Sequence, residues 1–353
     1  MQKINVCIIG GGNISNTRHI PALKKNKNVN IAGVVSNKQK NIDRTLQKYR
    51  IKNQFLLENN NPSSLEKCKW FKDIDAVVIG TPPREHYKLV DMCLRMNKHV
   101  LVEKPMTMNV EEAEKVIKLA KDNKRVFYVM HNFQYADGMK KLNEIIEEKR
   151  YGEIETINEI QFTNRDRRLP EWYNELPLGL FYDEAPHFIY LLERHGGPVN
   201  IEDASIIPNK KGESTPKFLS VHAHAGKVPV QMILNFNAPI CEWYYIVSFK
   251  KRILIYDFFK DILINLPSDN EHYASDIIKN SMGYTFQYWK GFISNGFKMV
   301  SGNLLYGHDH VMNNYISTIL KEKPIDKYLD AKQGLKNVQS LNEIVKKSFE
   351  KQV

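Results

Sequence analysis

The sequence predicts an α/β protein of two domains. The first is built on a parallel sheet with helices on both faces, and the second is an α/β domain on an open, mostly antiparallel sheet. Three observations support this prediction: short β-branched runs alternate with helical stretches over about the first 130 residues, a glycine-rich segment follows the first run, and long period-two runs dominate after residue 131.

Length and composition agree with two folded domains. The chain has 353 residues, and about 150 residues per domain is the usual prior. With 42% hydrophobic and 26% charged residues it has the composition of a soluble globular protein, which excludes a disordered or fibrous chain. The net charge of +11 favours anionic partners, such as phosphorylated small molecules, nucleic acid or an acidic membrane surface.

Cysteine spacing and the apolar segments indicate a cytoplasmic protein that spans no membrane. The four cysteines form no C-x-x-C pair, so we expect reduced thiols: Cys7, Cys68, Cys93 and Cys241. The apolar start of the chain is too short for a signal peptide. Residues 228–249 are interrupted by polar residues and a proline, so they predict two buried strands and a turn instead of a membrane helix.

In the first domain, strands and helices are expected in strict alternation. Short β-branched runs predict strands at 4–9, 29–35, 76–79, 99–102 and 126–130. Helical spacing of apolar residues predicts helices at 85–96 and 110–123.

The second domain begins with a helix and continues as a series of strands. A helix is expected at 140–149, and strands at 154–162, 218–224, 230–237, 244–249 and 253–258. Two last helices are expected at 309–321 and 331–347. We therefore divide the chain into domains 1–130 and 131–353, with the C-terminal helices expected to pack back on the first domain.

The glycine-rich segment after strand 4–9 fits a dinucleotide-binding loop. Gly10 would make the tight turn, Gly12 would let the backbone approach a pyrophosphate, and Ser15 would be the small third residue. The backbone N–H groups of Asn13 and Ile14, at the start of the following helix, would face the phosphates. The segment predicts a Rossmann domain that binds NAD(P), and the alternative is a structural glycine turn in another α/β protein.

The end of the second strand favours NADP, with NAD as the alternative. NAD-binding domains usually carry a carboxylate there for the ribose hydroxyls, and this chain has none. Ser36 and Asn37 can donate hydrogen bonds and Lys38 adds positive charge, a combination that suits a 2′-phosphate.

Three further motifs identify a family. They are Thr81-Pro82-Pro83-Arg84-Glu85-His86, then Glu103-Lys104-Pro105, and Asp183-Glu184-Ala185-Pro186-His187 at the head of a helical run. With the glycine loop, the following 18–23 segment and a closing segment from 323 to 348, the chain resembles the Gfo/Idh/MocA (glucose–fructose oxidoreductase, inositol dehydrogenase) family of oxidoreductases over nearly its whole length.

The resemblance implies a Rossmann domain followed by a substrate-binding domain whose sheet often forms an oligomer interface, so we expect a homo-oligomer. It implies catalytic roles for Lys104, Asp183 and His187. It also implies cofactor contacts at Thr81, Pro82, His86, Glu103 and Lys104.

The chemistry of these residue types suits oxidation of a secondary alcohol. His187 can act as acid or base near neutral pH, Asp183 can orient it or bind a substrate hydroxyl, and Lys104 can stabilise the developing alkoxide or relay a proton. The structural alternatives are a helix N-cap for Asp183, a core histidine for His187 and a surface lysine before a turn for Lys104.

Several positions depart from the family pattern. The family often has aspartate three residues after the histidine, where this chain has Tyr190, and glycine before it, where this chain has Pro186. The segment 131–135 lacks an arginine that many relatives carry. Inositol-like substrates are therefore less expected.

Candidate substrate contacts precede the histidine motif. Arg165, Arg167 and Arg168 lie with Trp172 and Tyr173 in one segment, and clustered guanidinium groups suit phosphate or carboxylate recognition. We expect substrate contacts from Arg165, Arg168, Trp172 and Tyr190. The alternative is a solvated basic loop.

Other features are expected to be structural. The pairs His222/His224 and His308/His310 lack nearby ligands, so no metal site is predicted. An apolar stripe within 286–304 (Phe286, Trp289, Ile293, Phe297, Val300 and Leu304) predicts a core or subunit-interface helix, and association with a membrane surface is the minority alternative. The positive charge is scattered and no nucleic-acid-binding module is present, so no nucleic-acid partner is expected.

Together these observations predict an NADP- or NAD-dependent oxidoreductase that acts on a secondary hydroxyl or ketone of a sugar or sugar derivative. The phosphorylated and nucleotide-linked forms of such a sugar are included in this prediction. One alternative is a hydrolase or epimerase of the same fold that uses a tightly bound cofactor for transient oxidation. The other is a non-catalytic regulator that binds a dinucleotide or ligand.

Overall fold

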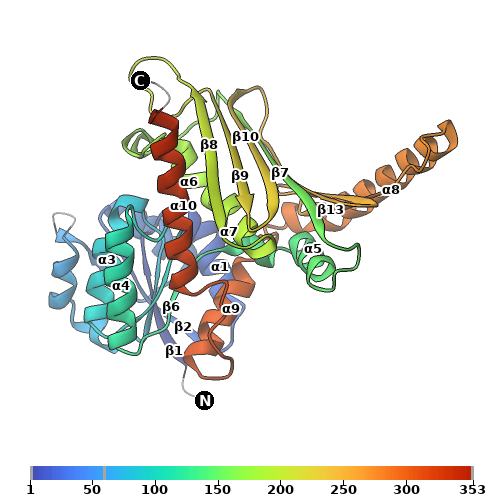
Figure 1. Ribbon diagram of the computed structural model, residues 1–353. Helices are drawn as coiled ribbons and strands as arrows, with labels where there is room; N and C mark the ends of the chain where they lie inside the picture. The colour runs from blue at the N-terminus through green and yellow to red at the C-terminus, as the bar shows by residue number, and fades with distance from the viewer. Residues whose placement is uncertain (1–2, 59–60, 351–353) are drawn as a thin grey trace. The chain divides into compact units, whose positions relative to one another are not determined.

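The computed structural model describes residues 3–58 and 61–350, and the chain divides into two compact units. The first comprises the chain up to Asn132 together with Gly307–Gln339. The second comprises Phe133–Tyr306 together with the chain from Ser340 onward. Figure 1 shows the elements of both units with the labels used below.

A parallel sheet forms the centre of the first unit. In the part of the chain that the structure describes, its strand order is β3-β2-β1-β4-β5-β6 and every pairing is parallel. The strands are β1 Ile4–Ile9, β2 Val29–Ser36, β3 Asn53–Leu56, β4 Ala76–Ile79, β5 His99–Val102 and β6 Phe127–Val129. The order confirms the predicted Rossmann fold. β3 was not predicted.

Helices cover both faces of this sheet. Consecutive residues of β1 from Val6 to Ile9 are fully buried, which requires cover on each side. The helices of the unit are η1 Ser15–His19, α1 Ile20–Lys24, α2 Gln39–Tyr49, α3 Pro83–Arg95, α4 Val110–Asp122 and α9 His308–Ile319, with short 3-10 turns at η3 Pro62–Lys67 and η4 Lys69–Asp73. Strand and helix side chains such as Val77, Val100 and Val116 form one apolar core.

The second unit is built on a mostly antiparallel sheet, as predicted. Its strand order is β13-β12-β11-β7-β10-β9-β8, and only the β7–β10 pair runs parallel among the strands described. The strands are β7 Ile154–Asn164, β8 Val199–Ile207, β9 Phe218–Ala225, β10 Val228–Ala238, β11 Glu242–Phe249, β12 Arg252–Asp257 and β13 Ile262–Pro267. β8 and β13 were not predicted.

One face of this sheet is buried and the other is partly exposed. Along β7, Ile157, Glu159, Gln161 and Thr163 are buried, whereas the residues between them are partly accessible. The helices of the unit are α5 Asp137–Glu147, α6 Leu180–Glu184, α7 Pro186–His195 and α8 Ala274–Val300, with 3-10 turns at η5 Asn132–Tyr135 and η6 Glu171–Glu175. α10, Ala331–Glu350, begins among residues of the first unit and ends among those of the second.

The predicted apolar stripe lies mostly in α8, and its prediction as a core helix is wrong. Phe286, Trp289, Ile293, Phe297 and Val300 are exposed. Leu304, the last residue of the predicted stripe, follows the helix and is buried. None of the helices described is both long enough and apolar enough to cross a membrane.

Candidate functional site

The glycine loop has the tight turn that its sequence predicts. Gly10 has a φ of +98°, and a Cβ there would lie 2.4 Å from the carbonyl oxygen of Gly80, so only glycine fits. Ser15 is buried and its hydroxyl donates to the Gly10 carbonyl over 2.5 Å. A Cβ at Gly12 would meet no atom within 4 Å, which leaves the backbone open at the position expected for a pyrophosphate.

A narrow pocket beside this loop gathers predicted cofactor residues from three strand ends. Gly10 follows β1, Ser36 and Asn37 end β2, and Thr81 and Pro82 follow β4; all five line the pocket. Ligands of open parallel sheets bind at this carboxyl edge. The next residue along, Lys38, is exposed at the start of α2.

Arg44 is a candidate cofactor residue that the sequence reasoning missed. It lies on α2, and its guanidinium donates to the carbonyl oxygen of Gly11 over 3.0 Å. An arginine near the glycine loop is the usual partner of a 2′-phosphate. In the sequence, Arg44 is one basic residue in the helix after the second strand. Because the chain is rich in lysine, a single basic residue there does not indicate a binding site.

His86 joins two of the family motifs. Its Nδ1 lies 2.7 Å from the carbonyl oxygen of Pro105 and its Nε2 lies 2.8 Å from that of Thr81. Burial lowers the pKa of His86, so the ring is neutral at pH 7 and one of the two nitrogens carries the donated proton. His86 therefore lies between the loops after β4 and β5 and donates one hydrogen bond, to one of these two carbonyl oxygens; a direct cofactor contact from it stays a prediction.

Glu103 is anchored by histidines from distant parts of the chain. Its Oε1 lies 2.7 Å from Nε2 of His19 and 3.9 Å from Nε2 of His308. Burial by itself would raise the pKa of Glu103, but the hydrogen bond from His19, together with the charges of both histidines and Lys104, lowers it to about 2. The carboxylate is thus ionised next to Lys104, which is 9% exposed.

His19, Glu103 and His308 form a group of possible metal ligands among the residues described, so the expectation that His308 lacks nearby ligand residues is wrong. Their ligand atoms lie within 4.8 Å of one another. At metal–ligand bonds of 2.0–2.1 Å, tetrahedral zinc ligands lie roughly 3.3 Å apart, so the 2.7 Å contact of His19 and Glu103 is a hydrogen bond. We assign a structural role to the cluster.

The other histidines considered as ligands lie elsewhere. His222 is exposed on β9, and His224 pairs with Glu202 of β8 at 2.9 Å.

In the second unit, Asp183 and His187 lie on successive short helices. Asp183 belongs to α6 and His187 to α7, with Ala185 between them. Pro186 has no N–H to continue the hydrogen-bond ladder, which accounts for the break in the single helix that the spacing predicted. Lys104 belongs to the first unit.

His187 is surrounded by aromatic side chains. It is 9% exposed, the edge of its ring meets Phe133 at a centroid distance of 4.8 Å, and Trp243 lies 6.1 Å away. Its Nδ1 lies 2.9 Å from the hydroxyl oxygen of Tyr190, one turn further along α7.

Tyr190 links His187 to the backbone. It is fully buried, and its hydroxyl oxygen accepts the N–H of Phe133 over 3.1 Å. A buried phenol O–H needs an acceptor, and Nδ1 of His187 is in place to be one. Tyr190 was predicted as a substrate contact; that role stays a prediction, whereas its contact with His187 is observed.

In the segment before α6 and α7, Tyr173 makes a hydrogen bond with Asp183. The Tyr173 hydroxyl donates to Oδ2 of Asp183 over 3.3 Å, and Trp172 stacks on the Tyr173 ring at 3.9 Å. Burial, followed by the negative charges of Asp183 and Glu184, raises the pKa of Tyr173, so the phenol stays protonated and remains a donor. Tyr173 thus occupies one side of the Asp183 carboxylate.

The arginines of this segment have different surroundings. Arg167 binds the buried carboxylate of Glu184 at 2.8 Å and fastens the segment to α6. Arg165 and Arg168 are exposed, and Arg165 lies 3.8 Å from the carboxylate of Asp166. Their roles as substrate contacts stay predictions.

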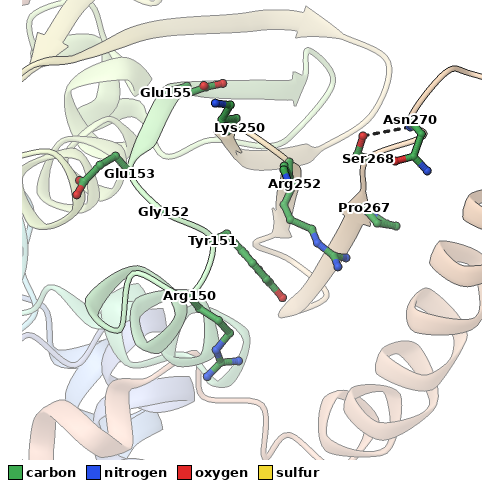
Figure 2. Close-up of a pocket in the computed structure, with 11 residues that line it drawn as sticks. Arg150, Tyr151, Gly152, Glu153, Glu155, Lys250, Arg252, Pro267, Ser268 and Asn270 are labelled. Carbon is green, nitrogen blue, oxygen red and sulfur yellow. Dashed lines mark hydrogen bonds between the residues drawn. The ribbon is translucent and has the colours of Figure 1, made fainter.

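A separate concave surface lies at the turn between β11 and β12. Figure 2 shows its lining, in which Arg150, Lys250 and Arg252 stand with Glu153 and Glu155. Positive and negative side chains are interspersed there, which gives no concentrated charge to bind an anion. Among the described residues that line it there is no residue of the predicted site, so we place no function in it.

Comparison with known proteins agrees with this fold and its motifs. Residues 4–131 match the family described as the Gfo/Idh/MocA oxidoreductase family with an NAD-binding Rossmann fold. Scyllo-inositol 2-dehydrogenase (NADP(+)) IolW from Bacillus subtilis strain 168 is 26% identical over 236 residues, which are 65% of this chain and 62% of the relative.

Solved structures show the same fold. The WlbA dehydrogenase from Bordetella pertussis, in complex with NADH and UDP-GlcNAcA, superposes with a TM-score of 0.77 at 15% identity over 99% of this chain and 96% of that one. An oxidoreductase from Thermotoga maritima gives a TM-score of 0.74 at 16% identity over 98% and 97%.

The fold and the glycine loop define a dinucleotide-binding Rossmann protein. Residues 4–131 match the Gfo/Idh/MocA family of oxidoreductases, in agreement with the motifs of that part of the chain. The chain spans 30%, 62% and 52% of the length of the first three curated relatives that it matches.

Proposed function

We propose that the protein is an NAD(P)-dependent oxidoreductase that acts on a secondary hydroxyl or ketone of a sugar or sugar derivative. The observation that carries the proposal is a buried histidine, His187, that is hydrogen-bonded at one ring nitrogen and follows the α6 carboxylate Asp183 by four residues. It accompanies a dinucleotide-binding loop whose backbone is open at Gly12. A bound nicotinamide would supply or accept the hydride, held through the glycine loop and the strand-end pocket.

The residues of this chain would then manage the proton. His187 would exchange a proton with the substrate oxygen, and Tyr190, whose hydroxyl oxygen lies 2.9 Å from Nδ1, would position its ring. Asp183 would bind a substrate hydroxyl, and the ammonium of Lys104 would stabilise negative charge on the reacting oxygen.

A phosphorylated or nucleotide-linked sugar is the substrate class that we propose. The exposed guanidinium groups of Arg165 and Arg168 suit phosphate groups, and the stacked Trp172–Tyr173 pair can contact a sugar or base. The WlbA structures named with UDP-GlcNAcA support this choice.

The proposal is tested by incubating the protein with a panel of free, phosphorylated and nucleotide-linked sugars and each oxidised cofactor. Reduction of the cofactor, followed by its absorbance, is the expected result. Conversion of a sugar with no net change in absorbance would instead indicate a hydrolase or epimerase with transient oxidation. No conversion and no dinucleotide binding would favour the regulatory alternative.

NADP is the cofactor that we propose, and Arg44 provides a test. Arg44→Ala should weaken NADPH binding about tenfold, or about 1.4 kcal/mol, because it removes a guanidinium from the expected 2′-phosphate position, and should leave NADH binding unchanged. Fluorescence titration with both cofactors measures this. Lys40→Ala on the same helix removes the same charge and should leave both affinities unaltered. Equal weakening of both cofactors in the Arg44 variant would contradict the assignment.

Tyr190 would donate to Nδ1 of the neutral His187 ring and so hold the ring in position for proton exchange. Tyr190→Phe removes the O–H that donates to Nδ1, so the reduction rate should fall at least about tenfold with little change in cofactor affinity. Selective ¹⁵N-histidine NMR of the wild type should show His187 protonated at Nε2 and bare at Nδ1.

A buried tyrosine with an unrelated role gives the control. Tyr256 donates its hydroxyl to Asp261 over 2.9 Å, and Tyr256→Phe should cost comparable stability but leave the His187 signal unmoved. A wild-type signal with the proton on Nδ1 would refute the role of Tyr190.

A further inference from the structure

Helix α8 packs on its sheet with its polar face. Gln287 accepts the N–H of Asn265 over 2.9 Å and donates to the carbonyl of the same residue over 3.1 Å. Asn295, the buried residue of α8, donates to the carbonyl oxygen of Asp261 over 2.8 Å. Between them, a Cβ at Gly291 would lie 2.8 Å from the side chain of Ile262, so the helix approaches β13 closely at this glycine.

The opposite face of α8 is apolar and points away from the sheet. We name as the outer stripe the seven side chains that recur at steps of three and four and are 56% to 92% exposed: Ile278, Met282, Phe286, Trp289, Ile293, Phe297 and Val300. Figure 1 shows α8 running along β13 and continuing past it.

This orientation is set by specific interactions. A surface helix ordinarily buries its apolar stripe and exposes its polar one. Here the amide pairs of Gln287 and Asn295 and the ion pair of Lys298 with Asp137, at 2.9 Å, hold the reverse arrangement. Turning the helix to bury the outer stripe would break all of these contacts. The contacts therefore keep the outer stripe exposed.

The exposed area and composition match a subunit interface. Five aromatic side chains of α8 are 42% to 77% exposed, namely Tyr284, Phe286, Trp289, Phe292 and Phe297. At about 150–250 Å² each when fully buried, they alone expose on the order of 400–700 Å². This area approaches the roughly 800 Å² that each partner of a standard interface buries. Aromatic residues and methionine are also the types enriched at interface cores.

The charges of α8 do not favour a membrane surface. An interfacial helix joins its apolar face to a strongly basic polar face that meets lipid headgroups. α8 carries Asp276, Lys279, Lys290 and Lys298, and Lys298 is bound to Asp137. Gln287 and Asn295 are engaged with the sheet, and Lys279 and Lys290 are the exposed lysines that remain, which is too few for a strongly basic face.

We propose that α8 is a self-association element whose outer stripe packs against the same stripe of a second copy of the chain. A two-fold arrangement places identical apolar patches together and closes the assembly. This surface is distinct from the partly exposed sheet face, and the proposal does not depend on the reaction.

The test is the mass of the full-length protein by light scattering after size-exclusion chromatography at micromolar concentration. Phe297→Arg and Trp289→Arg, each made singly, should weaken self-association about thirtyfold or more, as expected for central aromatic residues of an interface. Ser294→Arg adds the same charge to an exposed position beside the stripe and should leave the assembly unchanged. Thermal melts of all three should show that the fold is retained, since no buried residue is altered.

Each outcome decides the proposal. A wild-type oligomer that Phe297→Arg dissociates and Ser294→Arg does not supports it. A monomeric wild type overturns it, as does an oligomer of unchanged mass in both stripe variants. Co-sedimentation of a monomeric protein with vesicles of anionic phospholipid would assign the stripe to a membrane surface instead.

Discussion

His187→Gln is expected to lower the turnover number by on the order of 100- to 10,000-fold, the contribution of a positioned acid–base group. Glutamine can still accept the hydroxyl of Tyr190, so the local packing should survive, but it has no titratable nitrogen at the position of Nε2. Steady-state kinetics on the sugar identified by the panel, in both directions and at saturating cofactor, measures the effect.

Cofactor binding separates a catalytic loss from a structural one. The affinity for NADPH should stay within about twofold of wild type, since the predicted dinucleotide contacts come from other segments. His222→Gln makes the same exchange at an exposed position of β9 and should keep full activity. If the His187 variant also turned over at the wild-type rate, His187 would be a core histidine and the proposed site would be wrong. The turnover number of Lys104→Ala is expected to fall at least about tenfold. This variant then shows whether Lys104 is catalytic even if His187 is not.

The fold was largely readable from local patterns. Strands such as β1 and β4 are short and rich in apolar, β-branched residues, as is typical of buried parallel strands. β3 was missed because Asn53–Leu56 is a short edge strand in which two polar residues precede two apolar ones, so it shows neither an apolar run nor a period of two. β13 was missed because its position follows from pairing with β12, a tertiary contact that local periodicity does not report.

The orientation of α8 shows where periodicity stops being informative. The stripe through Phe286 and Phe297 was visible in the sequence, and hydrophobic patterning predicts that such a stripe is buried or partnered. Which side faces the sheet depends on the amide hydrogen bonds of Gln287 and Asn295 with residues of another segment. A one-dimensional pattern contains no record of those partners.

In the candidate site, too, some residue roles could be predicted from the sequence and others could not. Gly10 and Ser15 could be predicted because a tight turn dictates residue size within a few positions. The role of Glu103 could not, because His19 and His308 reach it from segments far away in the chain. Tyr190 was noticed as a departure from the family pattern, but its bond to His187 became evident from the structure.

A buried carboxyl on the central strand β7 gives the second prediction of large effect. Glu159 is 1% exposed, and within the residues described neither of its carboxylate oxygens has a hydrogen-bond partner. Tyr245, opposite it on β11, directs its hydroxyl to His195 at 2.8 Å. Burial raises the pKa of Glu159 well above its usual value, so the folded protein holds this side chain as the neutral acid.

The raised pKa fixes the sign of the pH dependence. Below about pH 4.3, the carboxyl is protonated in both folded and unfolded chains and contributes no difference. As the pH rises, the unfolded chain ionises while the folded chain stays protonated, so the free energy of unfolding falls by about 1.4 kcal/mol per pH unit until the folded pKa is reached. Glu159→Gln removes this term. Relative to wild type, the variant should therefore gain stability as pH rises above about 4.3, at up to about 1.4 kcal/mol per pH unit.

Denaturant melts of both proteins at a series of pH values measure the gain. Glu155→Gln changes an exposed position on the same strand. The difference in its free energy of unfolding from wild type should stay the same at every pH. The slope of the difference is the diagnostic quantity, because any packing change caused by the buried amide shifts all pH values equally. A Glu159→Gln variant that loses stability as pH rises would mean that the folded protein ionises Glu159 and stabilises the charge.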